Sequence, residues 1–212
     1  MRLIATLAAF LALGATAAEA STVFDLTGNG KWDSSYSFNE DNIGLTVSAG
    51  ENYGNSVYSG YDYLYQQNHH GLGVYSLFNG SDKELDGSYA SEVMTFLFDT
   101  AVQLVSITFS KVDSSDDFDF YFDSGSGLSK ISSDVDIPNS GQYVFSSLWS
   151  GTSFAFGADA SDDSFTIKKI EVAQVSAVPL PIALPLYGSG LAVLGFLGWR
   201  RRKAIGNSDT FA

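Results

Sequence analysis

One segment of the chain alternates strictly between polar and aromatic residues, and this pattern limits the folds that the chain can adopt. In Asp117–Asp123 the three phenylalanines Phe118, Phe120 and Phe122 occupy every second position. A period of two places them on one face of a β-strand. Val102–Ser110 is a second stretch of β-branched and aromatic residues, and no amphipathic helix is evident before residue 178. The sequence therefore predicts a sheet protein.

Further short apolar runs separated by turn signals extend this prediction to the whole of residues 21–177. Turn-forming Gly, Asn and Asp residues punctuate the runs at positions 28–30, 79–80, 86–87, 124–127 and 139–141. About ten strands at this spacing predict an all-β fold, an antiparallel β-sandwich of jelly-roll type. The additional predicted strands are 22–26, 44–48, 72–76, 94–98, 127–131, 143–147, 152–156 and 164–175.

The charge and cysteine content exclude several classes of function. Residues 21–177 hold 22 of the chain's 24 acidic residues and six of its 11 basic residues, which gives this region a net charge of −16. A nucleic-acid partner is not expected, because binding one requires a basic patch. The chain has no Cys, so a disulfide framework, a thiol nucleophile and a Cys-ligated zinc site are excluded.

The N-terminal 20 residues have the pattern of a secretory signal peptide. Arg2 precedes an apolar run from Leu3 to Leu13, and small residues follow it. Ala18 and Ala20 form an A-x-A site, which predicts cleavage before Ser21. Residues 1–20 are therefore expected to direct export through the Sec translocon.

A second apolar run lies near the C-terminus. Residues 182–199 are 18 residues without a charge, which is close to the length of about 20 that a transmembrane helix needs. The basic residues that follow predict that this end stays cytoplasmic, with residues 204–212 as a short tail. The basic cluster consists of Arg200, Arg201, Arg202 and Lys203.

The prolines before this run complete a known arrangement. Val178-Pro179-Leu180-Pro181, the apolar span and the basic cluster, over residues 178–203, resemble the PEP-CTERM sorting signal of the VPLPA type. The resemblance implies insertion in the inner membrane, recognition by an exosortase-like membrane protease, and transfer to the cell surface or extracellular matrix. The chain departs from the pattern at Ile182 and in the nine residues after the cluster. The alternative is a plain single-span membrane protein.

The catalytic motifs sought in the chain are absent. The two histidines, His69 and His70, are adjacent in a polar stretch, and no G-x-S-x-G or H-E-x-x-H pattern accompanies them. A glycosidase needs two carboxylates across a cleft, and so acidic a chain supplies such pairs by chance. We therefore expect a non-enzymatic surface or matrix protein, with an extracellular glycan-active hydrolase as the alternative.

Two acidic clusters are candidate calcium sites. Ca²⁺ takes six to eight oxygen ligands, which acidic loops between strands can supply. Neither cluster has the EF-hand spacing, and a solvated acidic loop is the alternative for both. The first cluster is Asp113, Asp116, Asp117 and Asp119, and the second is Asp82, Glu84 and Asp86.

A tyrosine-rich stretch is the candidate carbohydrate site. Tyr61, Tyr63 and Tyr65 alternate, which would place three rings on one face of a strand. Exposed rings could stack on sugars of an exopolysaccharide. The alternative is that the rings lie in the core with their hydroxyl groups at its edge.

Overall fold

The computed structural model describes residues 20–58, 62–76, 83–88, 90–175, 190–192 and 194–196. The chain divides into two units, residues 1–175 and 176–212, and all described strands belong to the first. They pair antiparallel throughout, which confirms the all-β prediction. The strands are β1 (Ser21–Asp25), β2 (Trp32–Asp33), β3 (Ser35–Glu40), β4 (Ile43–Tyr53), β5 (Ser56–Tyr58), β6 (Tyr63–Gln67), β7 (Gly71–Tyr75), β8 (Leu85–Asp86), β9 (Glu92–Ser110), β10 (Asp117–Asp123), β11 (Leu128–Asp136), β12 (Gln142–Val144), β13 (Ser150–Gly157) and β14 (Ser164–Gln174).

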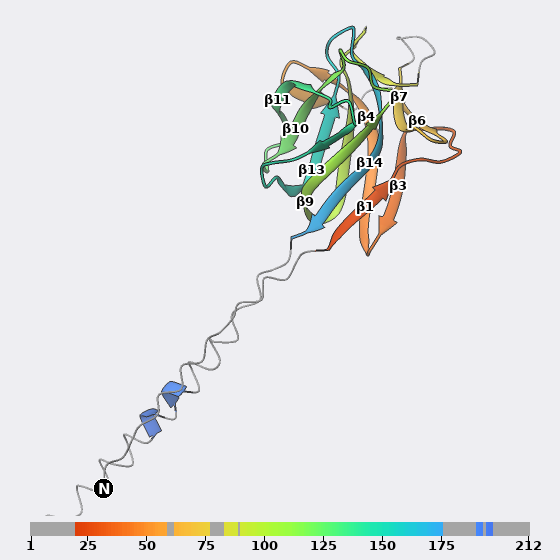
Figure 1. Ribbon diagram of the computed structural model, residues 1–212. Coiled ribbons are helices and arrows are strands. Elements are labelled where there is room, and N and C mark those ends of the chain that lie inside the picture. The colour runs from red at the N-terminus through yellow and green to blue at the C-terminus, as the bar shows by residue number, and fades with distance from the viewer. Residues whose placement is uncertain are drawn as a thin grey trace, which may run out of the picture. The chain divides into compact units, whose positions relative to one another are not determined.

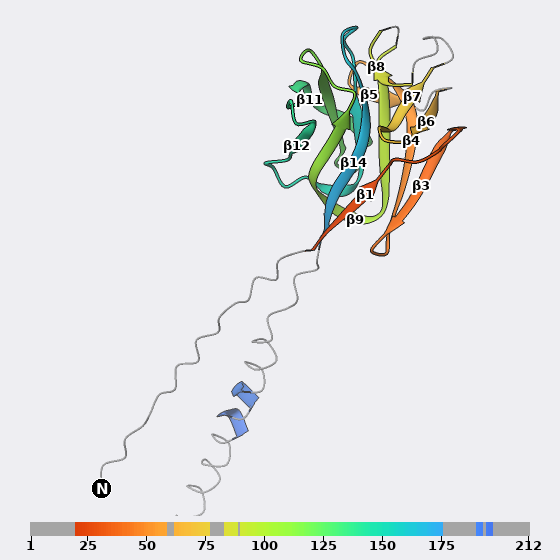
Figure 2. The same ribbon diagram turned by 45° about the vertical axis from the view of Figure 1, so that its right-hand side comes forward.

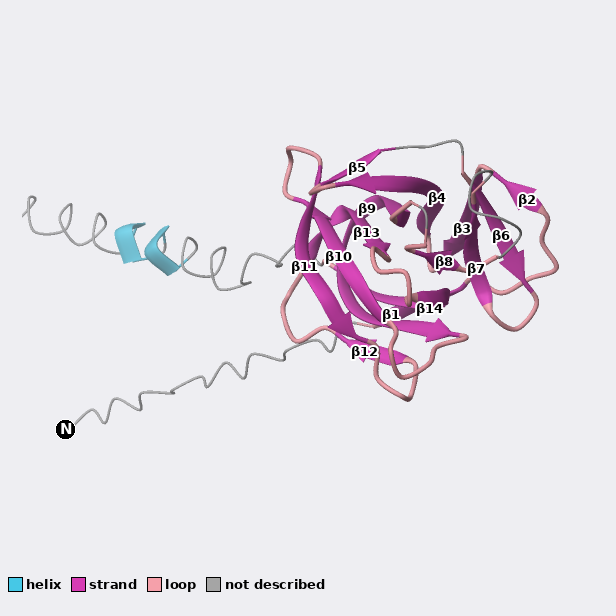
Figure 3. Ribbon diagram, turned by 90° about the horizontal axis from the view of Figure 1, so that it is seen from above, coloured by secondary structure: helices cyan, strands magenta, loops and turns pink. Residues whose placement is uncertain are grey.

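The long strand β9 joins the two layers of a sandwich-like fold. Its first half pairs with β4 on one side and with β13 on the other. Its second half pairs with β14 and β12. Viewed from above, β4 and β5 lie on one side of the fold and β1 and β12 on the other (Figure 3). The sequence predicted this strand as two separate ones, at 94–98 and 102–110, and the structure joins them into one.

Aromatic rings from both layers fill the space between them. Phe156 lies 5.5 Å from Phe96 and 6.0 Å from Phe118 between ring centroids, and Phe118 lies 5.0 Å from Phe109. All four side chains are buried. Burial of large apolar side chains is the main stabilising contribution to such a fold.

Strand β10 has the predicted bounds, but both of its faces are buried at the centre. Phe118 and Phe120 point into the main core, as their alternation predicted. On the opposite face Tyr121 packs in a second, small cluster with Val93 and Ala155. Neighbouring strands thus cover the second face of β10, although the acidic residues of the strand suggest that this face is open to solvent.

The first and last strands of the first unit lie side by side. β1 pairs with the end of β14, where Ser21 is opposite Ala173 (Figures 1 and 2). β7 pairs with β14 at the other end, where Ile167 is opposite Leu72. Six residue-to-residue steps along β14 separate the two positions, or about 20 Å at the usual rise per residue. Strands β2, β6 and β7 therefore lie toward the end of the fold away from the point where the chain enters and leaves.

Candidate functional site

Strands β2, β6 and β7 present four aromatic side chains on one outer face, which we call the aromatic platform: Trp32, Tyr63, Tyr65 and Tyr75. On β6, Leu64 is fully buried, so the alternating Tyr63 and Tyr65 face outward. The register places Trp32 opposite Tyr65, and Tyr75 opposite Tyr63. Cross-strand pairing thus gathers rings from three strands.

The platform leaves parts of its rings accessible to a ligand. The Trp32 ring lies 4.0 Å from the Tyr75 ring and 4.6 Å from the Tyr65 ring, between centroids. Trp32 is 42% exposed and Tyr63 is 39% exposed. Together with Tyr75 they line a shallow hollow of about 230 Å³. Large rings held this firmly at a surface form a rigid apolar contact area.

Lys83 lies at the edge of the platform. Its Nζ atom is 4.0 Å from the centre of the Tyr65 ring and 5.5 Å from that of Trp32. The close approach depends on Gly73, because a Cβ atom there would lie 1.9 Å from the Lys83 carbonyl oxygen. The Gln67 side chain donates a hydrogen bond to the same carbonyl oxygen. The backbone of Lys83 is therefore fixed against the outer face of β6 and β7.

A second, polar hollow of about 470 Å³ adjoins Lys83 and Tyr65. Its Gln66 side chain donates hydrogen bonds to the carbonyl oxygens of Leu26 and Thr27, at 3.1 and 3.2 Å. Amides, imidazoles and backbone groups can donate to and accept from sugar hydroxyl groups. The hollow, which we call the polar hollow, is lined by Gly28, Asn29, Gly30, Tyr65, Gln66, Gln67, Asn68, His69, His70 and Lys83.

The structure places part of the predicted tyrosine site and adds to it. Tyr63 and Tyr65 lie on one face of β6, as predicted, whereas Tyr61 lies outside the described residues. Trp32, Tyr75 and Lys83 were not predicted from the sequence. Of these, only Trp32 carried a signal, as one of three tryptophans in the chain and the one nearest the Gly28-Asn29-Gly30 turn.

In the first acidic cluster, Asp113 and Asp116 bind the local backbone. Asp116 accepts hydrogen bonds from the backbone N–H groups of Asp113 and Ser164, the latter at 2.9 Å. Asp113 accepts from the N–H group of Ser115 at 2.8 Å. Both carboxylates thus hold the loop before β10 in place.

The other two members of that cluster occupy a more charged environment. Asp119 is 2% exposed, and Lys130 Nζ lies 2.6 Å from its carboxylate and 2.7 Å from that of Asp159. Burial raises the pKa of Asp119. Burial also raises the pKa of Asp117 to about 6, and the nearby carboxylates, led by Asp163, add to this shift.

The second acidic cluster is likewise committed to contacts within the protein. Glu84 pairs with Lys111 at 2.6 Å and accepts a hydrogen bond from Ser164. Asp86 is buried, and Asp82 lies outside the described residues. Within the described part of the chain, no group of three or more His, Asp or Glu residues is placed to hold a metal ion. Calcium binding stays a prediction.

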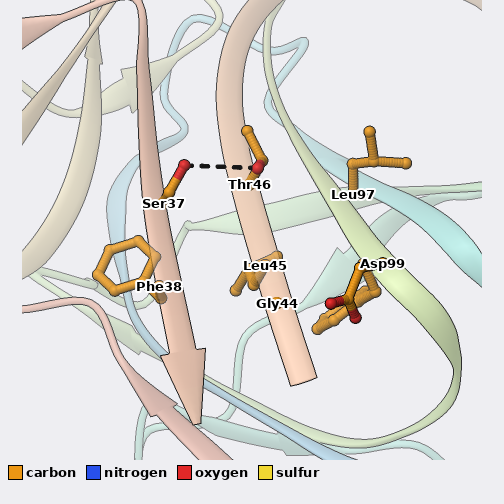
Figure 4. A pocket seen from close by; sticks show the side chains of 8 residues that line it. Ser37, Phe38, Gly44, Leu45, Thr46, Leu97 and Asp99 are labelled. Carbon is orange, nitrogen blue, oxygen red and sulfur yellow. Dashed lines mark hydrogen bonds between the residues drawn. The ribbon is translucent and has the colours of Figure 1, made fainter. Parts of the chain in front are cut away.

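A third hollow, of about 280 Å³, lies on the outer face of β3, β4 and β9. Figure 4 shows Ser37 of β3 and Thr46 of β4, which are joined by a hydrogen bond of 3.5 Å. Leu97 and Asp99 lie on the neighbouring strand β9. Asp99 is its one carboxylate. None of the three hollows described here is lined by a pair of carboxylates, the arrangement that a glycosidase would need.

The predicted sorting and export residues lie mostly outside the described residues. This holds for Ala18, for Val178–Pro181 and for Arg200–Lys203, while Ala20 is exposed and Ser21 begins β1. Among the described residues, no helix has both the length and the apolar character that a membrane crossing requires. The predicted helix at 182–199 is described only at 190–192 and 194–196.

Comparison with known proteins adds no further assignment. No protein-family model, no curated protein and no solved structure matches the chain.

Proposed function

We propose that this chain is an exported, non-enzymatic surface or matrix protein that binds carbohydrate on its aromatic platform. The observation that carries the proposal is the exposed pair Trp32 and Tyr63 beside Tyr75, on rigidly paired strands. Sugar rings have apolar C–H faces that pack against aromatic rings, while their hydroxyl groups need polar partners. The platform supplies the first kind of contact, and the adjoining polar hollow supplies the second.

A binding role accounts for the site better than catalysis does. The platform hollow is shallow and contains no carboxylate among its lining residues. The polar hollow has two histidines, and His70 Nδ1 is hydrogen-bonded to Ser110 Oγ at 2.9 Å. Ser110 is not among the described residues that line the polar hollow, so this hydrogen bond does not present a hydroxyl nucleophile to a bound sugar. Apolar stacking beside hydrogen-bonding groups is instead typical of a binding surface.

The proposed delivery route follows from the two ends of the sequence. A signal peptide would direct export, and the PEP-CTERM-like tail would hold the chain in the inner membrane until an exosortase-like protease releases it to the surface or the exopolysaccharide matrix. The first strand begins at Ser21, immediately after the predicted cleavage site, so removal of residues 1–20 would leave β1 intact. The jelly-roll form of the sandwich also stays a proposal.

Affinity electrophoresis in gels that contain a series of neutral and acidic polysaccharides tests the binding function. We expect at least one polysaccharide to retard the wild-type protein, and Trp32→Ala or Tyr63→Ala to abolish the retardation. Tyr53→Ala is the matched control, because Tyr53 is also an exposed strand tyrosine (65%) but lies on β4, outside the platform. No retardation of the wild type by any polysaccharide, or equal retardation of Trp32→Ala, would refute the proposal.

A further inference from the structure

We propose that the platform selects sugars that carry a carboxylate, such as uronic acids, and that Lys83 is the residue that recognises this group. The inference rests on the proposed carbohydrate-binding function and names the class of sugar that the site prefers. It depends on the position of Lys83, on its lack of an ion-pair partner among the described residues, and on the contact between rings that line the two hollows.

Lys83 differs from the lysines that stabilise the fold. Lys111, Lys130 and Lys169 each have a carboxylate within 3.5 Å. The Nζ atom of Lys83 instead lies over the Tyr65 and Trp32 rings, and among the described residues it has no ion-pair partner. An ammonium group held against aromatic faces retains N–H groups that can donate to a ligand.

The surroundings of Lys83 contrast with the charge of the domain. Residues 21–177 carry −16, yet among the described residues no aspartate or glutamate lines either the platform hollow or the polar hollow. An acidic polymer is repelled by most of this surface, because like charges raise the energy of approach. A carboxylate can therefore be accommodated at Lys83 and is opposed on most of the remaining surface.

The two hollows adjoin through the contact between Trp32 and Tyr65, and Lys83 lies over both rings, an arrangement that suits a chain of sugars. The platform hollow is bounded by Trp32, whose ring contacts Tyr65, and Tyr65 with Lys83 lines the polar hollow. One sugar unit would stack on Trp32 and Tyr63, and the next would lie in the polar hollow. A carboxylate on either unit near the junction would accept a charge-assisted hydrogen bond from Lys83 Nζ.

The test compares each acidic polymer with its methyl ester, which lacks the negative charge. Oligomers of polygalacturonate, alginate and hyaluronan are each titrated against the protein in two forms. One form, called the acid below, carries ionised carboxylates, and the other is the neutral methyl ester. We expect the wild type to bind at least one free acid about tenfold more tightly than its ester, the effect of one hydrogen bond to a charged group. Raising the salt concentration should reduce this preference.

Substitutions at Lys83 separate charge recognition from stacking. Lys83→Met keeps an unbranched side chain over the rings but removes the charge, so we expect the ratio of acid to ester affinity to fall to about one. Lys83→Arg should retain the preference. Lys169→Met is the matched control, since Lys169 is an exposed lysine paired with Asp25 on the β1–β14 side of the fold, and we expect no effect from it.

The outcomes distinguish this inference from the function on which it rests. Equal binding of acid and ester in every pair would overturn the inference and leave carbohydrate binding standing. The same holds if an acid preference survives in Lys83→Met. If the wild type binds other polysaccharides but no member of these pairs, the inference is overturned again. Failure to bind any polysaccharide would remove the proposed function itself.

Discussion

Lys130 contributes to stability by its position between two carboxylates, one of them fully enclosed. The side chain of Asp119 is 2% exposed, and that of Lys130 is 14% exposed. Burial lowers the pKa of Lys130, but Asp119 and Asp159 more than offset this and raise it. Removing the ammonium would leave the Asp119 carboxylate buried without its counter-charge.

We therefore expect Lys130→Met to lower the free energy of unfolding by about 3 kcal/mol, as for other buried pairs that lose one partner. Lys111→Met is the control, because the Lys111–Glu84 pair is more exposed, with side-chain exposures of 29% and 25%. Such a pair contributes about 1 kcal/mol or less. Urea unfolding of both variants checks the difference, and equal losses would contradict the account.

Asp117 makes stability depend on pH. Its pKa rises from the ordinary 3.8 to about 6 in the folded protein, because of burial and the carboxylates of Asp163 and Asp134. The folded state then binds more protons than the unfolded state between these values, so the free energy of unfolding falls as pH rises through this range.

Asp117→Asn should raise the melting temperature at pH 7 and have little effect near pH 4, where the folded wild-type carboxyl is already protonated. Glu40→Gln, which removes a carboxylate from an exposed strand residue, serves as the matched control. A melting curve of Asp117→Asn that shifts equally at both pH values would argue against the raised pKa.

At the scale of elements, the β3–β4 hairpin has a two-residue turn with left-handed backbone. Asp41 and Asn42 have φ angles of 49° and 63°, and Glu40 is paired with Ile43 on either side of them. A hairpin turn of this geometry favours Asn, Asp and Gly, whereas β-branched residues are strained in it.

Asn42→Val should therefore lower the free energy of unfolding by about 1–2 kcal/mol, and Asn42→Gly should leave it unchanged or raise it. Position 42 is the better test, because Asp41 also accepts a hydrogen bond from Thr22. Chemical denaturation measures both variants. If Val were tolerated as well as Gly, the turn would not have the backbone described here.

Elements were predictable from the sequence where local alternation is strong. β10 has its predicted bounds, because Phe118, Phe120 and Phe122 alternate with polar residues. β2 was not predicted, since its two residues are too few to show a period. The platform depends on pairing between strands that are distant in the sequence, so local alternation revealed Tyr63 and Tyr65 but not Trp32 or Tyr75. The position of Lys83 could not be predicted from the sequence either, because it depends on contact with Gly73.

At the scale of the whole molecule, the first strand, β1, pairs with the last strand, β14. Strands β2, β6 and β7 lie toward the opposite end of the fold. The export proposal predicts that the mature protein begins at Ser21 and ends near residues 178–181. Intact mass spectrometry of protein from the native host, separated into membrane and exterior fractions, tests this. A mass that extends to Ala212 in the membrane fraction would show that the tail is a permanent anchor.

The central claim is that carbohydrate binds at Trp32, and the indole N–H signals of the ¹⁵N-labelled protein test it most directly. The chain has three tryptophans, Trp32, Trp149 and Trp199, and Trp149 packs against Phe120 and Phe122 away from the platform. Adding a polysaccharide fragment that binds should shift the Trp32 signal and leave the Trp149 signal in place. Binding that leaves the Trp32 signal unchanged would contradict the account.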